Sequence, residues 1–136
     1  MKTIEQVKRE NKNRASLIDA VIERLGGMDD ELMGTIEDIA GHGADAGWCG
    51  FTYTKDTCEF YQANRKEIND WIKNTAEETG SKSSVELVKG FRCMDGEIED
   101  NIGRCLYGGR LTDDTDNVQN GLAWFALEEV CRLFEN

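Results

Sequence analysis

The chain has 136 residues, of which 39% are hydrophobic and 32% charged, values typical of one soluble globular domain. Asp and Glu outnumber Lys and Arg by 27 to 16, and the net charge of −11 argues against direct binding to nucleic acid or to anionic membranes. No apolar run approaches the roughly 18 residues of a membrane span. The charged N-terminus lacks a signal-peptide pattern, so the sequence predicts a cytoplasmic protein whose five cysteines are reduced.

The negative charge is unevenly distributed along the chain. Residues 1–27 carry a balance of +2, whereas the remaining residues carry −13. A field of this sign favours a basic partner surface, such as the nucleic-acid channel of another protein. Solubility alone is the simpler explanation of the same acidity.

The N-terminal part predicts two helices. Apolar spacing indicates a first helix over residues 3–25, with Thr3 as its cap and a glycine pair after it. Its middle, KRENKNR, is fully polar, so its first half is expected to be solvated or partly detached from the domain. A second helix is expected from Asp29 or Asp30 to about Ala40, with Gly41 as its stop.

The stretch Gly41–Tyr61, GHGADAGWCGFTYTKDTCEFY, differs from its helical surroundings. Four glycines are too many for a regular helix, so a Gly-rich loop is predicted, with residues 51–53 briefly extended. A long helix follows from Thr54 to Thr79, with a break predicted near Asn64.

The C-terminal part predicts three more helices. A short one is capped by Ser83, another begins at Asp95, and the last begins at Asp116 or Asn117. Proline, a common helix breaker, is absent. The sequence therefore predicts a single all-α domain over residues 1–136, built as a compact array of five to six helices with at most a very short extended segment.

The Gly-rich stretch contains the residue types of a chemical site. His42, Asp45, Cys49 and Cys58 include zinc-ligand types, but their spacing matches no common zinc motif. Either Cys49 or Cys58 also fits a Cys–His nucleophile pair with His42, and Asp45 is available to orient the histidine. Because many unrelated loops contain such residues, the sequence predicts no catalytic residue, no metal and no cofactor.

A partner-binding surface is the alternative interpretation of the same chain. Trp48 and Tyr53 are candidate anchors, since tryptophan and tyrosine are enriched at binding hot spots. The acidic runs supply candidate contacts to basic side chains: Asp95, Glu97, Glu99, Asp100, Asp113, Asp114 and Asp116. Capping of helix N-termini is the structural explanation of the same acids.

Two stretches, HGADAGWCGFTYTKDTCEFY (His42–Tyr61) and NGLAWFALEEVCRLF (Asn120–Phe134), carry a resemblance. From about residue 30 onward, the chain resembles a family of small, uncharacterised acidic proteins encoded by phages, plasmids and conjugative elements of gut bacteria. The resemblance implies a genomic setting and transfers no site residue. Small acidic proteins from such elements often counter host defence, as anti-CRISPR and antirestriction proteins do.

The leading functional hypothesis is therefore a non-enzymatic protein-binding domain with an acidic, DNA-mimicking surface. Its expected partner is the basic surface of a host nucleic-acid-binding defence protein, such as a CRISPR effector or a restriction enzyme. Two alternatives stay open: a small enzyme or metal-binding domain centred on the His42–Cys58 loop, and a structural homo-oligomer.

Overall fold

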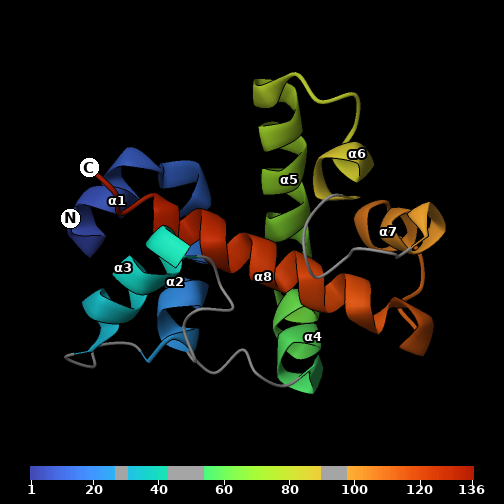
Figure 1. Cartoon of the computed structure of the whole chain (residues 1–136), viewed down its shortest axis with the longest axis horizontal. Helices are drawn as coiled ribbons and strands as arrows, with labels where there is room; N and C mark the ends of the chain where they lie inside the picture. The colour runs from blue at the N-terminus through green and yellow to red at the C-terminus, as the bar shows by residue number, and fades with distance from the viewer. Residues whose placement is uncertain (27–30, 43–53, 90–97) are drawn as a thin grey trace. The chain divides into compact units, whose positions relative to one another are not determined.

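The computed structural model describes residues 1–26, 31–42, 54–89 and 98–136 (Figure 1). Every regular element in these ranges is helical, which confirms the predicted all-α class for the part of the chain described. The predicted number of helices is wrong, since these ranges contain eight α-helices rather than five to six. The predicted Gly-rich loop and the extended segment at residues 51–53 lie outside the described residues.

The elements follow one another in this order: α1 (Ile4–Glu10), η1 (Lys12–Arg14), α2 (Ala15–Arg24), α3 (Leu32–His42), α4 (Thr54–Ala63), α5 (Arg65–Thr79), α6 (Ser84–Lys89), α7 (Glu99–Leu106), η4 (Asp113–Thr115) and α8 (Asp116–Arg132). They form two compact units, one of Met1–Thr52 with Phe125–Asn136 and one of Tyr53–Trp124. Helix α8 contributes residues to both units. None of the described helices has the length and apolarity needed to cross a membrane.

Two asparagines account for the additional helices. Asn11 leaves the helical region of the backbone, and its side-chain amide donates to the Val7 carbonyl at 2.8 Å. The Asn64 backbone also leaves the helical region, and its side-chain amide donates to the Phe60 carbonyl at 3.0 Å. This confirms the break predicted near Asn64. In both cases the side chain competes for a carbonyl that a continuous helix would use, so each predicted long helix divides into two.

The first unit buries the apolar face predicted for residues 17–25 against α3 and the end of α8. Its buried side chains are Val7, Leu17, Ile18, Val21, Ile22, Leu32, Ile36, Ile39, Phe125, Ala126, Leu127, Val130, Cys131 and Phe134. The N–H of Lys2 donates to the Phe134 carbonyl at 3.0 Å, so α1 packs within this unit. Helix α3 continues through Gly41 to His42, which corrects the stop predicted at Gly41.

The second unit places α5, α6 and α7 side by side (Figure 1). Gly80 ends α5 in a left-handed conformation with φ of 72°, and the Ser83 hydroxyl accepts from the Glu86 N–H at 3.1 Å, both as predicted. Helix α7 begins at Glu99, after an extended Ile98, and not at Asp95. Residues Asp113–Thr115 form η4, and α8 begins at Asp116, one of the two starts predicted.

Candidate protein-binding site

The site is built on a polar cluster that holds the C-terminal end of α7. The Arg65 guanidinium donates to three carbonyls, those of Cys105 at 2.9 Å, Arg104 at 2.6 Å and Gly109 at 3.1 Å. The Asn69 amide donates to the Cys105 carbonyl at 2.9 Å. Because the last carbonyls of a helix have no partner within it, these side chains satisfy groups that would otherwise be unpaired.

Tyr61 and Gly109 complete this cluster. The Tyr61 hydroxyl lies 2.8 Å from Asn69 Oδ1 and 3.0 Å from the Cys105 carbonyl, and burial raises its pKa so that it stays protonated. A Cβ atom on Gly109 would lie 2.9 Å from the Arg104 Cα, so only glycine lets the chain return so close to α7. The end of α7 is thereby fixed, and with it the position of Tyr107.

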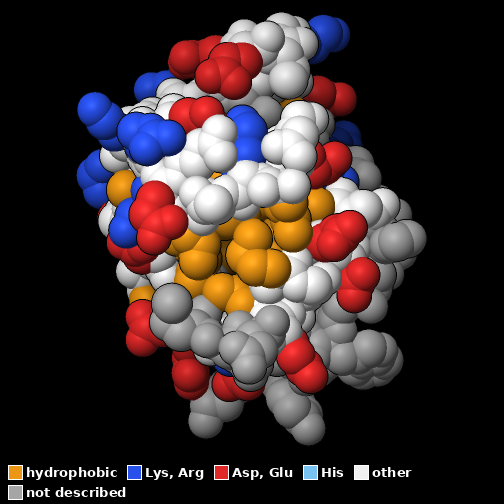
Figure 2. Space-filling model, turned by 90° about the vertical axis from the view of Figure 1, so that its left-hand side faces the viewer, with side chains coloured by type: hydrophobic (Ala, Val, Ile, Leu, Met, Phe, Trp, Pro, Cys, Tyr) orange, Lys and Arg blue, Asp and Glu red, His pale blue; other side chains and the backbone are white. Residues whose placement is uncertain are grey.

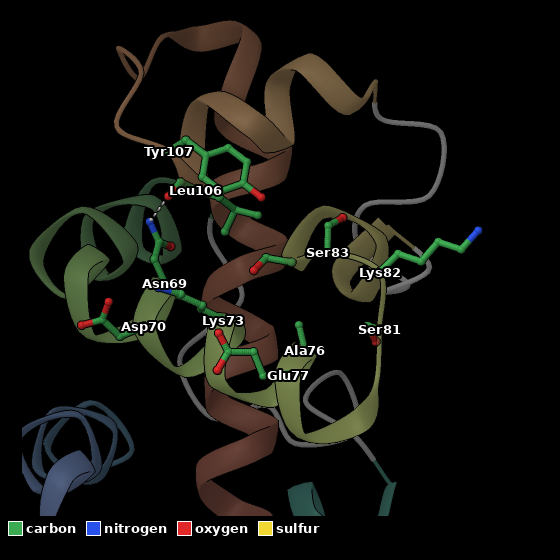
Figure 3. Close-up of a pocket in the computed structure, with 11 residues that line it drawn as sticks. Asn69, Asp70, Lys73, Ala76, Glu77, Ser81, Lys82, Ser83, Leu106 and Tyr107 are labelled. Carbon is green, nitrogen blue, oxygen red and sulfur yellow. Dashed lines mark hydrogen bonds between the residues drawn. The ribbon is translucent and has the colours of Figure 1, made fainter.

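Tyr107 follows α7 directly, and 67% of its surface is exposed. Its ring extends over a hollow of about 410 Å³ between α5, the residues before α6 and the end of α7 (Figure 3). A second hollow of about 540 Å³ lies between α6 and α7, and Tyr107 and Ser83 line both. The exposed ring therefore stands at the border of two depressions on one face of the second unit.

The second hollow is predominantly acidic. Glu86, Glu99 and Asp100 line it together with Arg104 as the one basic residue in its lining. Glu99 forms an ion pair of 2.5 Å with Lys89, and both side chains are exposed. The lining of this second hollow, which includes Tyr107, therefore carries more negative than positive charge.

Two of the acidic runs converge at this end of the second unit. Helix α7 contacts η4, and the Asn101 amide donates to the Asp114 carbonyl at 2.9 Å. Glu99 and Asp100 at the start of α7 therefore lie near Asp113 and Asp114, all four exposed. Asp116 differs from them, because it is half-buried and its backbone carbonyl accepts from the Cys58 thiol at 3.4 Å.

Several predicted site residues cannot be placed. The positions Asp45, Trp48, Cys49, Tyr53, Asp95 and Glu97 lie outside the described residues, as does the His42 side chain.

Cys58 is the described member of the candidate chemical site, and it is buried on α4. Burial raises the pKa of its thiol to about 11, with the nearby Asp116 and Glu59 adding to the shift. A thiol with this pKa is protonated at neutral pH and is a poor nucleophile. Within the described ranges, no group of three His, Cys, Asp or Glu side chains is placed to hold a metal ion.

Tyr107 was missed by the sequence analysis. The apolar face of α7 consists of Ile102, Cys105 and Leu106, and Tyr107 follows this face by one residue. An aromatic residue outside the buried face and directly before a glycine pair is the signal that indicates an exposed ring. The sequence contains this signal, but nothing in it shows the hollows on either side.

The first unit has a smaller hollow of about 320 Å³, lined by Met1, Glu37, Ala40, Gly41, Glu135 and Asn136. In Figure 2, which shows the left-hand side of the view in Figure 1, hydrophobic side chains gather in the middle, with both acidic and basic side chains around them. The hollow combines carboxylates with apolar atoms and lacks an exposed aromatic ring among its lining residues.

Comparison with known proteins identifies a family. The sequence profile described as "Domain of unknown function (DUF7222)" matches residues 5–135, nearly the whole chain. The chain belongs to this family. No curated protein and no solved structure shows significant similarity to it.

Proposed function

We propose that the chain is a non-enzymatic protein-binding domain, in which the acidic end of the second unit binds a basic, nucleic-acid-binding surface of another protein. The observation that carries the proposal is the convergence of Glu99 and Asp100 with Asp113 and Asp114, joined by the hydrogen bond from Asn101 to the Asp114 carbonyl. Three of these exposed carboxylates, with Glu99 already paired to Lys89, attract lysine and arginine side chains arranged to bind phosphates.

The narrower form of the proposal is an inhibitor of a host defence protein, of the anti-CRISPR or antirestriction type, encoded by a mobile element. The net charge of −11 and the small size support it, because an acidic domain competes with nucleic acid for one basic channel. The resemblance to proteins of phages and mobile elements points in the same direction.

The test compares two triple variants of the full chain with the same change in net charge. The first carries Asp100→Asn, Asp113→Asn and Asp114→Asn. The second carries Glu5→Gln, Glu23→Gln and Glu135→Gln, three exposed residues of the first unit. Each immobilised protein is incubated with host lysate, and the bound proteins are eluted with double-stranded DNA.

We expect the wild type and the second triple variant, which carries Glu5→Gln, to retain basic proteins that DNA releases. The first triple variant, which carries Asp100→Asn, should not retain them. Binding should also weaken steeply as the salt concentration rises, because exposed charges are screened. The proposal is refuted if DNA releases no basic protein from the wild type, or if the two triple variants lose binding equally.

A further inference from the structure

Tyr107 is the most exposed large apolar side chain that the structure describes, ahead of Ile98 at 60% and Met1 at 45%. Its backbone position is fixed by the polar cluster at the end of α7, where Arg65 binds the carbonyls of Arg104, Cys105 and Gly109. An exposed aromatic ring on a held backbone loses little conformational entropy when it binds a partner.

The surface beside the ring is shaped by a glycine. Gly103 lies one turn before Tyr107 in α7, and a Cβ atom placed there would be 4.0 Å from the Tyr107 Cδ2 atom. The ring therefore lies close to the backbone of α7 at Gly103. The hollow between α6 and α7 includes both residues in its lining.

The charged residues in the lining of this hollow indicate what kind of group would bind beside the Tyr107 ring. Glu86 and Asp100 line this hollow with Glu99, while Arg104 supplies the basic charge of its lining. Glu99 is paired with Lys89, which also attracts Glu86, so the carboxylates of Glu86, Glu99 and Asp100 exceed the charges of Lys89 and Arg104 by one in the hollow that Tyr107 lines. A cation with a flat, apolar face satisfies both features, because it stacks on the ring while its N–H groups donate to the carboxylates.

We propose that the hollow between α6 and α7 is an arginine-binding site, in which Tyr107 stacks on a guanidinium group of an extended segment of a partner protein. This proposal rests on the proposed function, which supplies the kind of partner, and it adds the surface of this chain that contacts the partner. Arginine is favoured over lysine because the guanidinium is planar, weakly hydrated and donates in a fork, whereas the ammonium group is a compact and strongly hydrated charge.

The test uses the full chain and two short synthetic peptides. One peptide contains two arginines separated by an alanine, and its counterpart contains lysines at the same positions. Each is titrated into isotopically labelled protein at about 150 mM salt, where long-range attraction is screened. Backbone amide shifts measured by NMR give both the affinity and the location of binding.

For the wild type, we expect shifts over residues 83–86 and 99–107, and about two- to fivefold tighter binding of the arginine peptide, the range of an exposed cation–π contact. Tyr107→Leu should abolish this preference while leaving the lysine peptide nearly unaffected. Tyr107→Phe, the matched control, should keep it because the ring remains. Asp100→Asn should weaken binding of both peptides.

The arginine site is refuted if the shifts lie elsewhere, if neither peptide binds, or if Tyr107→Leu keeps the preference for arginine. If one of these results is obtained while DNA still releases a basic partner in the lysate experiment, only the arginine site is refuted. If the lysate experiment itself fails, the proposed function is refuted. Analytical ultracentrifugation of the chain without peptide tests whether a second copy of the chain occupies the hollow instead. A dimer that Tyr107→Leu dissociates would assign the hollow to a second copy and overturn the proposal.

Discussion

Replacing Arg65 with methionine should destabilise the protein through the end of α7. The guanidinium donates to the carbonyls of Arg104, Cys105 and Gly109, and methionine keeps much of the aliphatic stem while removing all three bonds. A hydrogen bond from a charged donor contributes about 1.5–3 kcal/mol to stability. Adding three such bonds gives an upper limit for the loss in the free energy of unfolding, and the actual loss is smaller.

Two features reduce this limit. The Cys105 carbonyl also accepts from the Asn69 amide at 2.9 Å and lies 3.0 Å from the Tyr61 hydroxyl, so it keeps other donors in the variant. The bond to the Arg104 carbonyl lies at an exposed position, where water replaces part of its contribution. We therefore expect a loss of about 2–3 kcal/mol in the free energy of unfolding.

Urea denaturation followed by far-ultraviolet circular dichroism measures this loss. With a denaturant dependence of about 1–3 kcal/mol per molar urea, the midpoint should fall by about 0.7–3 M. Lys66→Met is the matched control, because it removes the same charge from the next residue of α5. The Lys66–Asp70 pair is exposed, with an N–O distance of 2.9 Å, and water screens it, so it contributes little to stability. Equal destabilisation by the two variants would refute the hydrogen-bonding role of Arg65.

Three further predictions concern glycine, pH and thiols. Gly109→Ala should cost about 1–3 kcal/mol in urea denaturation, because its Cβ would lie 2.9 Å from the Arg104 Cα. Burial is the largest influence on Glu129 and raises the pKa of its carboxyl above the usual 4.5, so its ionisation opposes folding as pH rises through and above that value. The stability gained by Glu129→Gln, measured by thermal unfolding, should therefore be larger at neutral pH than at pH 4. Burial raises the pKa values of Cys58 and Cys105 to about 11 and about 12, so mass spectrometry should find them alkylated by iodoacetamide only after unfolding.

Each of these three has its own control or contrary result. Gly103→Ala places a methyl group at an ordinary contact distance of 4.0 Å and should change stability far less than Gly109→Ala. A stability difference for Glu129→Gln that does not change with pH would show that its ionisation is not linked to folding. Rapid alkylation of Cys58 in the native protein would show that its thiol is accessible.

Local signals in the sequence predicted several helix ends in both units. Thr3, Ser83 and Gly80 perform their expected capping roles because each acts on backbone groups within a few residues. The helix interruption at Asn11 was missed, because the polar run around it contains too few apolar residues for its periodicity to show a break. Gly41 was misread because an exposed glycine with open space around it is tolerated inside a helix.

The candidate site depends on contacts between distant residues, which the sequence pattern does not contain. Tyr107 owes its position to Arg65 and Asn69, which lie in α5 and precede it in the sequence by α6 and α7. The acidic runs of α7 and η4 meet because Asn101 binds the Asp114 carbonyl, a contact between a side chain and a backbone group that no periodicity predicts. The residue types were therefore predictable, but their convergence was not.

The order of the units along the chain has a consequence for folding during synthesis. The second unit is contiguous, Tyr53–Trp124, so all its residues are available before the last helix is finished. The first unit needs Phe125–Asn136, and the hydrogen bond from the Lys2 N–H to the Phe134 carbonyl closes nearly the full length of the chain. The first unit therefore cannot complete its core until Phe125–Asn136 have been synthesised, and until then its apolar face is open to chaperones and to other chains.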